Sequence, residues 1–369
     1  MTKELRKKLC LYGILLGLLA LGVFTLLFPG EDFSMQERRY LAHAPENYSL
    51  TQWTLKDDLE SFLSDRLPLR NAFVGVSSVY DLALLRRTQQ DVWAVKGMLV
   101  ERPIEADDGA LQRSLDRMAA LAEENGLSAQ MILVPSAGAV LSKAMPSHLA
   151  RLYRPEVQAH EAAAANPLVI PMQGLLSSNA KDTYFKTDHH WSLSGAYMAY
   201  EAYCAANGLA PLPLSQFRLT AYEDFLGSTY SRSGLFTWKR DTLRSAEPVT
   251  PLTFTVPGEE TAVHSSLLFP ESFHSWDPYT VFMNGNPGYA EIENPIAPEG
   301  HLMVLKDSFA NTLLPLLSAH YSRITVVDLR YYAGNFQSAL AQAGHPDQLL
   351  FCYSLDSTLH DTAVQRKLR

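Results

Sequence analysis

The sequence is short of cysteine, of positive charge and of internal repetition. Three cysteines in 369 residues are too few to imply a disulfide framework. Cys10 falls in an apolar run near the N-terminus, while Cys204 and Cys352 either pair in an oxidising compartment or stay as two separate buried thiols. A formal net charge of −8 without a basic stripe argues against a nucleic-acid partner. The absence of repeats and low-complexity tracts argues against a string of modules.

One long stretch has no charge at all. The run from Leu9 to Phe28, LCLYGILLGLLALGVFTLLF, is about 20 residues long, enough for a helix to cross the roughly 30 Å hydrocarbon layer of a bilayer. Basic residues precede it and Glu31 and Asp32 follow, so the positive-inside rule places residues 1–8 in the cytoplasm and the remainder outside. A cleaved signal peptide is the alternative, but the run exceeds the usual length of about 7–15 residues and no small-x-small site follows. We therefore expect a single-pass anchor at residues 9–28 of a cell-membrane protein.

The rest of the chain predicts a helical segment followed by one α/β domain. Residues 29–105 contain apolar positions at helical spacing that are interrupted at Pro68, which predicts two membrane-proximal helices. From about residue 106 to 369, helical and strand patterns alternate, and HLMVLKDSFANTLLPLLSAHYSRITVVDLRYY has the strand, helix, strand pattern of a βαβ unit. Residues 211–298 are rich in Thr, Ser, Pro, Gly and aromatic side chains, which predicts an insertion of short strands and loops.

A serine follows the first strand of that βαβ unit. The strand pattern stops at Lys306 and a helix begins at or just after Ser308. A serine at such a turn, on the carboxyl edge of a parallel sheet, is exposed to ligand near backbone N–H groups that can stabilise an oxyanion, which suits a nucleophile. The alternative is that Asp307 or Ser308 only caps the helix, since both residue types are preferred at that position.

The stretch TDHHWSLSGAY supplies the partners that a nucleophilic serine needs. A histidine must take the serine's proton, and an acid must hold that histidine. Asp188 and His190 project to the same side if the backbone is extended before a helix that begins near Ser192, and His189 then points elsewhere. The acid and the histidines could instead cap the helix. A metal site is disfavoured because no further His, Cys or carboxylate follows at a regular ligand spacing.

The same stretch resembles the signature of the bacterial DHHW family, which is similar to the alginate O-acetyltransferase group of SGNH-hydrolase-like proteins. In that group an Asp-x-His-Trp motif precedes a Gly-Asp-Ser motif. The resemblance covers most of the chain. It extends to the segments ERRYLAHAP, LESFLSDRLPLRNAF, GMLVERP, KDSFANTLLPLL and ITVVDLRYY.

The resemblance implies a mechanism and a fold. It assigns Ser308 as nucleophile, His190 as general base and Asp188 as the acid that orients the base. It also implies an SGNH-hydrolase-like, flavodoxin-like α/β fold with a three-layer parallel sheet. The chemistry that it implies is acyl-ester transfer or hydrolysis outside the cytoplasm, without a cofactor or a metal.

Several further residues are weaker candidates for oxyanion or substrate binding. Sites of this group complete the oxyanion hole with a glycine N–H and an asparagine amide, and FMNGNPG offers Asn284, Gly285 and Asn286, although a plain turn explains these residues as well. Asn311 is expected to be an exposed helix residue, and Arg330 an ion-pair partner of Asp328.

One departure from the wider group stands next to the serine. Lys306 occupies the position of the glycine, so the turn must be made with a side chain present.

The expected function is a membrane-anchored O-acetyltransferase or acetylesterase that acts on a cell-surface or secreted polysaccharide, with an acetyl donor or a membrane-embedded acyltransferase as partner. The alternative is a catalytically inactive SGNH-like protein that binds glycan or serves in envelope assembly.

Overall fold

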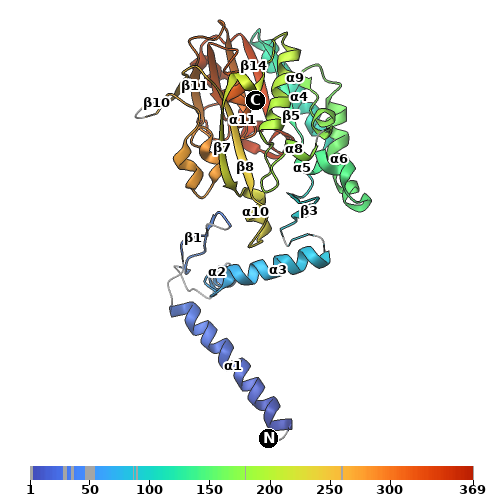
Figure 1. Cartoon of the computed structure of the whole chain (residues 1–369), viewed down its shortest axis with the longest axis vertical. Helices are drawn as coiled ribbons and strands as arrows, with labels where there is room; N and C mark the ends of the chain where they lie inside the picture. The colour runs from blue at the N-terminus through green and yellow to red at the C-terminus, as the bar shows by residue number, and fades with distance from the viewer. Residues whose placement is uncertain are drawn as a thin grey trace. The chain divides into compact units, whose positions relative to one another are not determined.

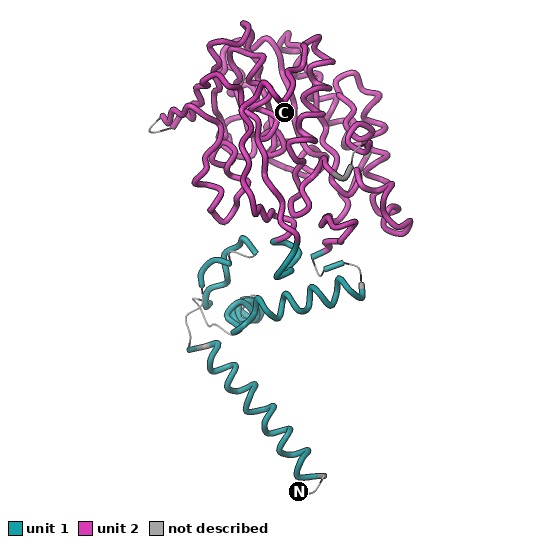
Figure 2. The backbone as a smooth tube through the Cα atoms, viewed as in Figure 1, with its two compact units in different colours: residues 1–90, 231–238 teal, residues 91–230, 239–369 magenta. Residues whose placement is uncertain are grey.

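The computed structural model describes residues 3–27, 31–34, 37–45, 55–85, 87–88, 90–178, 180–258 and 261–368. The chain divides into two compact units (Figure 2). Unit 1 contains residues 1–90 and 231–238, and unit 2 contains residues 91–230 and 239–369. All the residues expected to do chemistry belong to unit 2.

Unit 1 is mainly helical. Its first helix, α1 (Lys3–Leu27), includes the 22-residue segment Glu4–Thr25, which is long and apolar enough to cross a membrane and of which only 6% is buried. The expected anchor lies within α1 except for Phe28, which is outside the described residues. The next two helices, α2 (Leu55–Asp65) and α3 (Arg70–Leu85), are separated at Pro68, where the sequence predicts a break. The short strands are β1 (Phe33–Ser34) and β2 (Arg39–Tyr40).

Unit 2 is built on one eight-stranded sheet with the order β10-β9-β11-β13-β12-β14-β5-β6. Figure 1 labels β10, β11, β14 and β5 of this sheet. Its strands are β5 (Ser128–Val134), β6 (Val169–Ile170), β9 (Thr253–Val256), β10 (Ala262–His264), β11 (Tyr289–Glu293), β12 (His301–Lys306), β13 (Arg323–Val327) and β14 (Gln348–Ser354). Two separate pairs are β3 (Trp93–Val95) with β4 (Met98–Val100), and β7 (Phe217–Phe225) with β8 (Asp241–Pro248).

The prediction of an α/β fold is confirmed, but the sheet is mixed rather than fully parallel. The strands β6, β5, β14, β12 and β13 are parallel, whereas β11, β9 and β10 pair antiparallel with their neighbours. These three antiparallel strands all come from the 211–298 insertion, so this region extends the central sheet. A strand can join an edge in this way without the crossover helix that a parallel neighbour requires.

Helices cover both faces of the sheet because successive side chains of a strand point to opposite sides. Leu302 and Val304 of β12 pack in one hydrophobic cluster, with α9 (Leu193–Ala206) and α11 (Ala310–Leu317). Met303 and Leu305 pack in the other, with α4 (Asp108–Glu124) and α12 (Phe336–Ala343). The remaining helices of unit 2 are α5 (Ala137–Leu141), α6 (Ser147–Ala163), α7 (Gln173–Ser177), α8 (Ala180–Thr183), α13 (Leu355–His360) and α14 (Thr362–Lys367), while α10 (Ser228–Ser233) crosses the boundary with unit 1.

The segment from β12 to β14 places its two helices, α11 and α12, on opposite faces of the sheet. The chain moves from β12 through α11 to β13, and then returns past β12 through α12 to β14, which pairs with the other side of β12. Because parallel crossovers are right-handed, reversing the direction of travel moves the helix to the other face. Counted along the chain, the five parallel strands lie in the order 2-1-5-3-4, which differs from the expected flavodoxin-like order 2-1-3-4-5.

The two cysteines of unit 2 are separate. Cys204 lies in α9 and Cys352 in β14, and both are buried free thiols. The second of the two arrangements left open by the sequence is therefore observed.

Candidate active site

The turn after β12 is closed by Asp307 and leaves the hydroxyl of Ser308 available. The buried Asp307 carboxylate accepts the backbone N–H of Phe309 at 3.0 Å and that of Ser354 at 2.7 Å, and its own N–H donates to Cys352 O at 3.0 Å. The first helical residue follows Phe309, and no side chain caps this helix at that position. Asp307 thus ties the turn to the end of β14, and Ser308 does not act as a helix cap.

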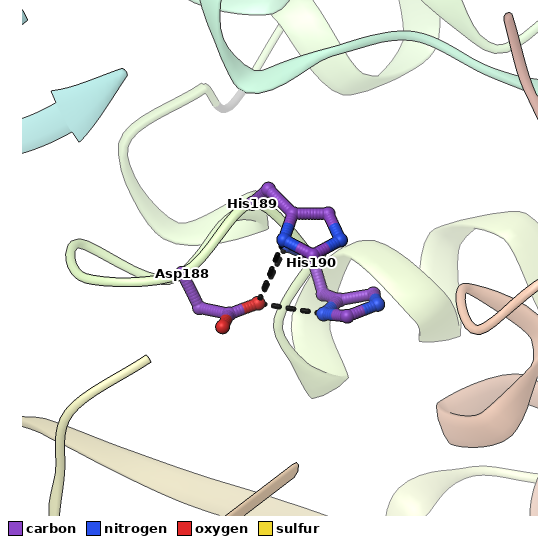
Figure 3. A group of neighbouring side chains, drawn as sticks. All are labelled: Asp188, His189 and His190. Atoms are coloured by element: carbon purple, nitrogen blue, oxygen red, sulfur yellow. Dashed lines mark hydrogen bonds and ion pairs between the residues drawn. The ribbon is translucent and has the colours of Figure 1, made fainter. Parts of the chain in front are cut away.

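The Ser308 hydroxyl points at His190. The distance from Ser308 Oγ to His190 Nε2 is 2.7 Å. His190 Nδ1 lies 2.6 Å from Asp188 Oδ1, the contact marked by the dashed line between these two residues in Figure 3. An ionised carboxylate can only accept, so the imidazole carries its proton on Nδ1 and Nε2 accepts from the serine. The structure therefore brings the three residues of the predicted triad into one chain of hydrogen bonds.

A tight loop presents Asp188 and His190. Tyr184 and Trp191 form an isolated antiparallel bridge, and Phe185 N–H donates to His190 O at 3.2 Å, so residues 186–190 run as a series of bends between them. The helix that follows is capped by Ser192, whose side chain accepts from Ser194 N–H and Gly195 N–H. Asp188 is therefore not the cap of this helix.

The expectation that His189 points elsewhere is wrong. Its ring lies 3.9 Å from the His190 ring, centroid to centroid, and its Nδ1 is 2.7 Å from Ser228 Oγ. The alternation of side chains holds for an extended strand, and this segment is bent instead. His189 thus forms one wall of the site.

Asp188, His189 and His190 also form a group whose ligand atoms lie within 4.8 Å of one another, as a metal site requires. In this arrangement the Nδ1 atoms of both histidines are already hydrogen-bonded, to Asp188 and to Ser228. A zinc ion bound at about 2.0–2.1 Å from those nitrogens would have to replace both bonds. Binding of a metal through these two Nδ1 atoms therefore competes with the hydrogen bonds present.

Gly227 and Ser228 hold Asp188 from the other side, and sequence reasoning missed them. Ser228 N–H donates to Asp188 Oδ2 at 2.7 Å. A Cβ at Gly227 would lie 2.3 Å from the same oxygen, so only glycine lets the backbone approach so closely. The sequence gives no signal for this contact, because GS reads as an ordinary turn.

Two aromatic residues fix the histidine and the serine relative to each other. Tyr279, from the 211–298 insertion, stacks on the His190 ring with centroids 3.8 Å apart and the planes 1° from parallel. Its hydroxyl lies 2.9 Å from Thr312 Oγ1 of α11. Trp191 is fully buried, and its Nε1–H donates to Phe309 O at 2.9 Å.

The electrostatics of the relay favour a neutral imidazole beside an ionised carboxylate. The pKa of His190 is lowered to about 4, first by burial and then by the neighbouring His189, while Asp188 opposes both effects. Burial by itself raises the pKa of Asp188, but the charges of His190 and His189 and the hydrogen bonds from His190 hold it well below the usual range. At neutral pH His190 is therefore ready to accept a proton.

Lys306 is fully buried and organises the weaker candidates around its ammonium group. Its Nζ donates to Asn286 Oδ1 at 2.9 Å and to Asn311 Oδ1 at 2.8 Å, and lies 3.6 Å from Asp328 Oδ2. Burial lowers the pKa of Lys306 to about 8, and Asp328 opposes that shift. The Arg330 guanidinium donates two hydrogen bonds to the Asp328 carboxylate, at 2.9 and 2.7 Å, which is the ion pair that the sequence predicts.

The chain makes the turn before Ser308 without the glycine of the wider group. Lys306 is the last residue of β12, and neither it nor Asp307 nor Ser308 adopts a positive φ. The strained turn lies instead at Met283, Asn284 and Gly285, which have φ values of 55°, 53° and 110°.

The candidate oxyanion residues differ in their surroundings. Asn284 Oδ1 accepts from Ser272 Oγ at 2.7 Å, and Gly285 O accepts from Asn311 Nδ2 at 3.5 Å. Asn311 is 1% exposed, so the expectation of an exposed helix residue is wrong. Because Lys306 only donates, Asn286 must turn Oδ1 toward it, which turns Asn286 Nδ2 away.

The site lies in a segment that matches a known family. Residues 171–327 match the family model described as DHHW protein. The resemblance to the DHHW family is confirmed. The DHHW segment contains both the motif from Asp188 to Trp191 and Ser308. No curated protein matches the chain at a significant level.

The fold is shared with two of the solved structures to which the chain is similar, the first two described here. A DHHW family protein from Eubacterium siraeum is 22% identical with a TM-score of 0.63, over 75% of this chain and 94% of that one. Bacillus cereus PatB1 with a sulfonyl adduct is 20% identical with a TM-score of 0.60, over 74% of this chain and 98% of that one. The O-acetyltransferase domain of Pseudomonas putida AlgJ is 12% identical with a TM-score of 0.40, over 72% of this chain and 90% of that one.

Replacing the buried lysine tests its structural role. We expect Lys306→Met to lower the free energy of unfolding by about 3 kcal/mol, because Asn311 Oδ1 loses the donor at 2.8 Å and the buried Asp328 carboxylate loses one of its two neighbouring cations. Lys143→Met, at an exposed position, should change it by less than about 0.5 kcal/mol. Urea titration followed by tryptophan fluorescence measures both. Equal stability of the two variants would contradict the role assigned to Lys306.

Proposed function

We propose that the chain is a serine O-acetyltransferase or acetylesterase of SGNH-like fold that acts on a cell-surface or secreted polysaccharide. The observation that carries the proposal is the continuous hydrogen-bond chain from Ser308 Oγ through His190 to the buried Asp188 carboxylate. Such a chain activates a hydroxyl that is a poor nucleophile by itself.

The proposed reaction has two steps. Ser308 Oγ attacks the carbonyl carbon of an acetyl ester while its proton passes to His190 Nε2, and the carbonyl oxygen becomes an oxyanion. The carbon–oxygen bond to the leaving alcohol then breaks, and His190 returns the proton to that alcohol, which leaves an acetylated Ser308. In the second step a sugar hydroxyl or water gives its proton to His190 and attacks the acetyl carbonyl carbon. The bond from that carbon to Ser308 Oγ then breaks, and His190 returns the proton to Ser308 Oγ.

Two donors are candidates for the oxyanion. Phe309 N–H is occupied by Asp307, whereas among the described residues Ser308 N–H has no protein acceptor. Asn286 Nδ2, turned away from Lys306, is the second candidate. A pair of such donors is the usual means of stabilising a tetrahedral intermediate.

The choice between transfer and hydrolysis depends on which hydroxyl reaches the acetylated serine. A transferase needs an acetyl donor, supplied directly or by a membrane-embedded acyltransferase partner.

We further propose that α1 anchors the chain with residues 1–8 in the cytoplasm and the catalytic domain outside. The proposed organisation is an anchor at 9–28, a membrane-proximal segment at 29–105 and an SGNH-like domain at 106–369.

The sulfonyl adduct recorded for PatB1 suggests a direct test. Phenylmethanesulfonyl fluoride should attach to Ser308 Oγ with loss of fluoride, and the chain should release acetate from 4-nitrophenyl acetate. Ser308→Ala should abolish both, while Ser228→Ala should still be labelled, because the Ser228 hydroxyl contacts His189 and not His190. Labelling and mass spectrometry of the two variants measure this. An unlabelled, inactive wild-type chain would favour the non-catalytic glycan-binding alternative, and loss of turnover on chelation would favour a metal site.

The role of the acid is tested by Asp188→Asn. A neutral amide no longer fixes the Nδ1–H tautomer or stabilises the imidazolium, so turnover should fall by about 10⁴-fold. Asp116→Asn, at an exposed position of α4, should leave the rate unchanged. Initial rates with 4-nitrophenyl acetate check both. A wild-type rate for Asp188→Asn would remove this carboxylate from the mechanism.

The pH dependence follows from the lowered pKa of His190. The imidazole is neutral above its pKa of about 4, so the rate should stay level from pH 7 to about 5 and fall by half near pH 4. Unfolded histidine binds protons from about pH 6.5 downward, so acid also lowers the stability of the folded state in this range. Rates must therefore be measured where tryptophan fluorescence reports folded protein. A midpoint near 6.5 would contradict a buried base.

A further inference from the structure

The helix α3 turns an entirely apolar surface outward. The residues of this surface, called here the α3 face, are Ala72, Phe73, Val76, Val79, Tyr80, Ala83 and Leu84. All seven are exposed, and the five large side chains are between 44% and 64% exposed. Their spacing of three and four residues places them on one side of the helix. No charged or amide side chain interrupts this surface.

The side of α3 opposite this surface packs within unit 1 and carries polar residues together with Val74. Ser78 is buried against Gly234, and Gly75 lies against the Phe236 ring. Arg70, at the start of the helix, pairs with Glu37 at 2.6 Å. In the described part of unit 1, these contacts lie on the side of α3 opposite the α3 face, and the α3 face itself is exposed.

The residue before α3 adds to the exposed apolar surface at some conformational cost. Leu69 is 76% exposed and has a φ of 60°, a region that a leucine seldom adopts. Its carbonyl accepts the N–H of Phe73 at 3.1 Å, so it belongs to the first turn of the helix. A leucine that is exposed on a strained backbone fits a surface that another molecule covers when the protein functions.

Three features favour lipid over a protein as the covering. The same chain carries α1, whose Glu4–Thr25 segment is suited to a bilayer, and only residues 28–54 separate α1 from α2. The α3 face includes Tyr80, and two basic residues, Arg86 and Arg87, follow the helix in the sequence. Tyrosine and arginine side chains suit the headgroup layer. A stable protein interface uses roughly 20–30 residues a side, and this face offers far fewer.

We propose that the α3 face lies in the interfacial layer of the membrane that α1 spans, so that two elements hold the chain to the bilayer. A helix of this kind lies parallel to the membrane with its apolar side at the boundary between headgroups and acyl chains. This inference rests on the proposed anchor but not on the proposed catalysis.

The test uses the full chain in vesicles of phosphatidylcholine and phosphatidylglycerol, with a nitroxide label at one introduced cysteine. Cys10→Ser provides the background, because Cys204 and Cys352 are buried and their thiols have pKa values raised by that burial. The label is placed at Val76→Cys on the α3 face. The matched control is Asn71→Cys, which is exposed on the same helix but outside the face.

The expected result is a difference in collision rates between the two labels. At Val76→Cys, collisions with oxygen, which concentrates in lipid, should exceed those with a water-soluble nickel chelate several-fold, and at Asn71→Cys the order should reverse. Equal access of the nickel chelate to both labels would overturn the proposal. Spin–spin broadening at Val76→Cys that disappears on dilution with unlabelled chain would identify a second copy as the occupant, and shielding from both reagents a different protein.

A third label separates this proposal from that of the anchor. Leu16→Cys, on an exposed position of α1, should be reached by oxygen and not by the nickel chelate. If the Leu16→Cys label lies in lipid and the Val76→Cys label does not, the interfacial role of α3 is wrong and the anchor stands. If neither label lies in lipid, both proposals are wrong.

Discussion

The buried carboxylate of Asp188 is the constraint on which the rest of the site depends. A carboxylate removed from water must be hydrogen-bonded, and this one receives the backbone N–H and the ring N–H of His190 on one oxygen and Ser228 N–H on the other. The approach of the Ser228 segment requires glycine at position 227. Once Nδ1 of the imidazole is held by Asp188, Nε2 can face only the opposite direction, where Ser308 lies.

Three contacts join the segment around His190 to the turn around Ser308. The first is the hydrogen bond between these two side chains, the second runs from Trp191 to the carbonyl of Phe309, and the third passes through Tyr279, which stacks on His190 and reaches Thr312. Each contact restricts a different group, namely the hydroxyl, the backbone and the ring. A site held in this way by rigid elements keeps its geometry without help from a ligand.

Local sequence patterns predict some features of the site and miss others. The hydrophobic pattern predicts the strand, turn and helix around Ser308. Asp188 lies beside His190 because the segment after Tyr184 is bent, just as an extended segment would have placed it. The pairing of His190 with Ser308, which are 118 positions apart, came from the resemblance to the DHHW family, because no spacing rule relates residues so distant. The orientation of His189 was predicted wrongly, since a period of two applies only to extended backbone. Gly227 and Tyr279 left no signal at all.

The sequence by itself determined the features that depend on neighbouring residues. These are the long apolar helix near the N-terminus, the break between α2 and α3, the alternation of helices and strands, and the βαβ unit that carries Ser308. Only the tertiary structure decided which strands pair, that β9, β10 and β11 extend the main sheet, and that Lys306 is buried among Asn286, Asn311 and Asp328. The physical reason is that periodicity reports which side of an element is apolar, whereas pairing and buried charge depend on groups that folding brings together from distant parts of the chain.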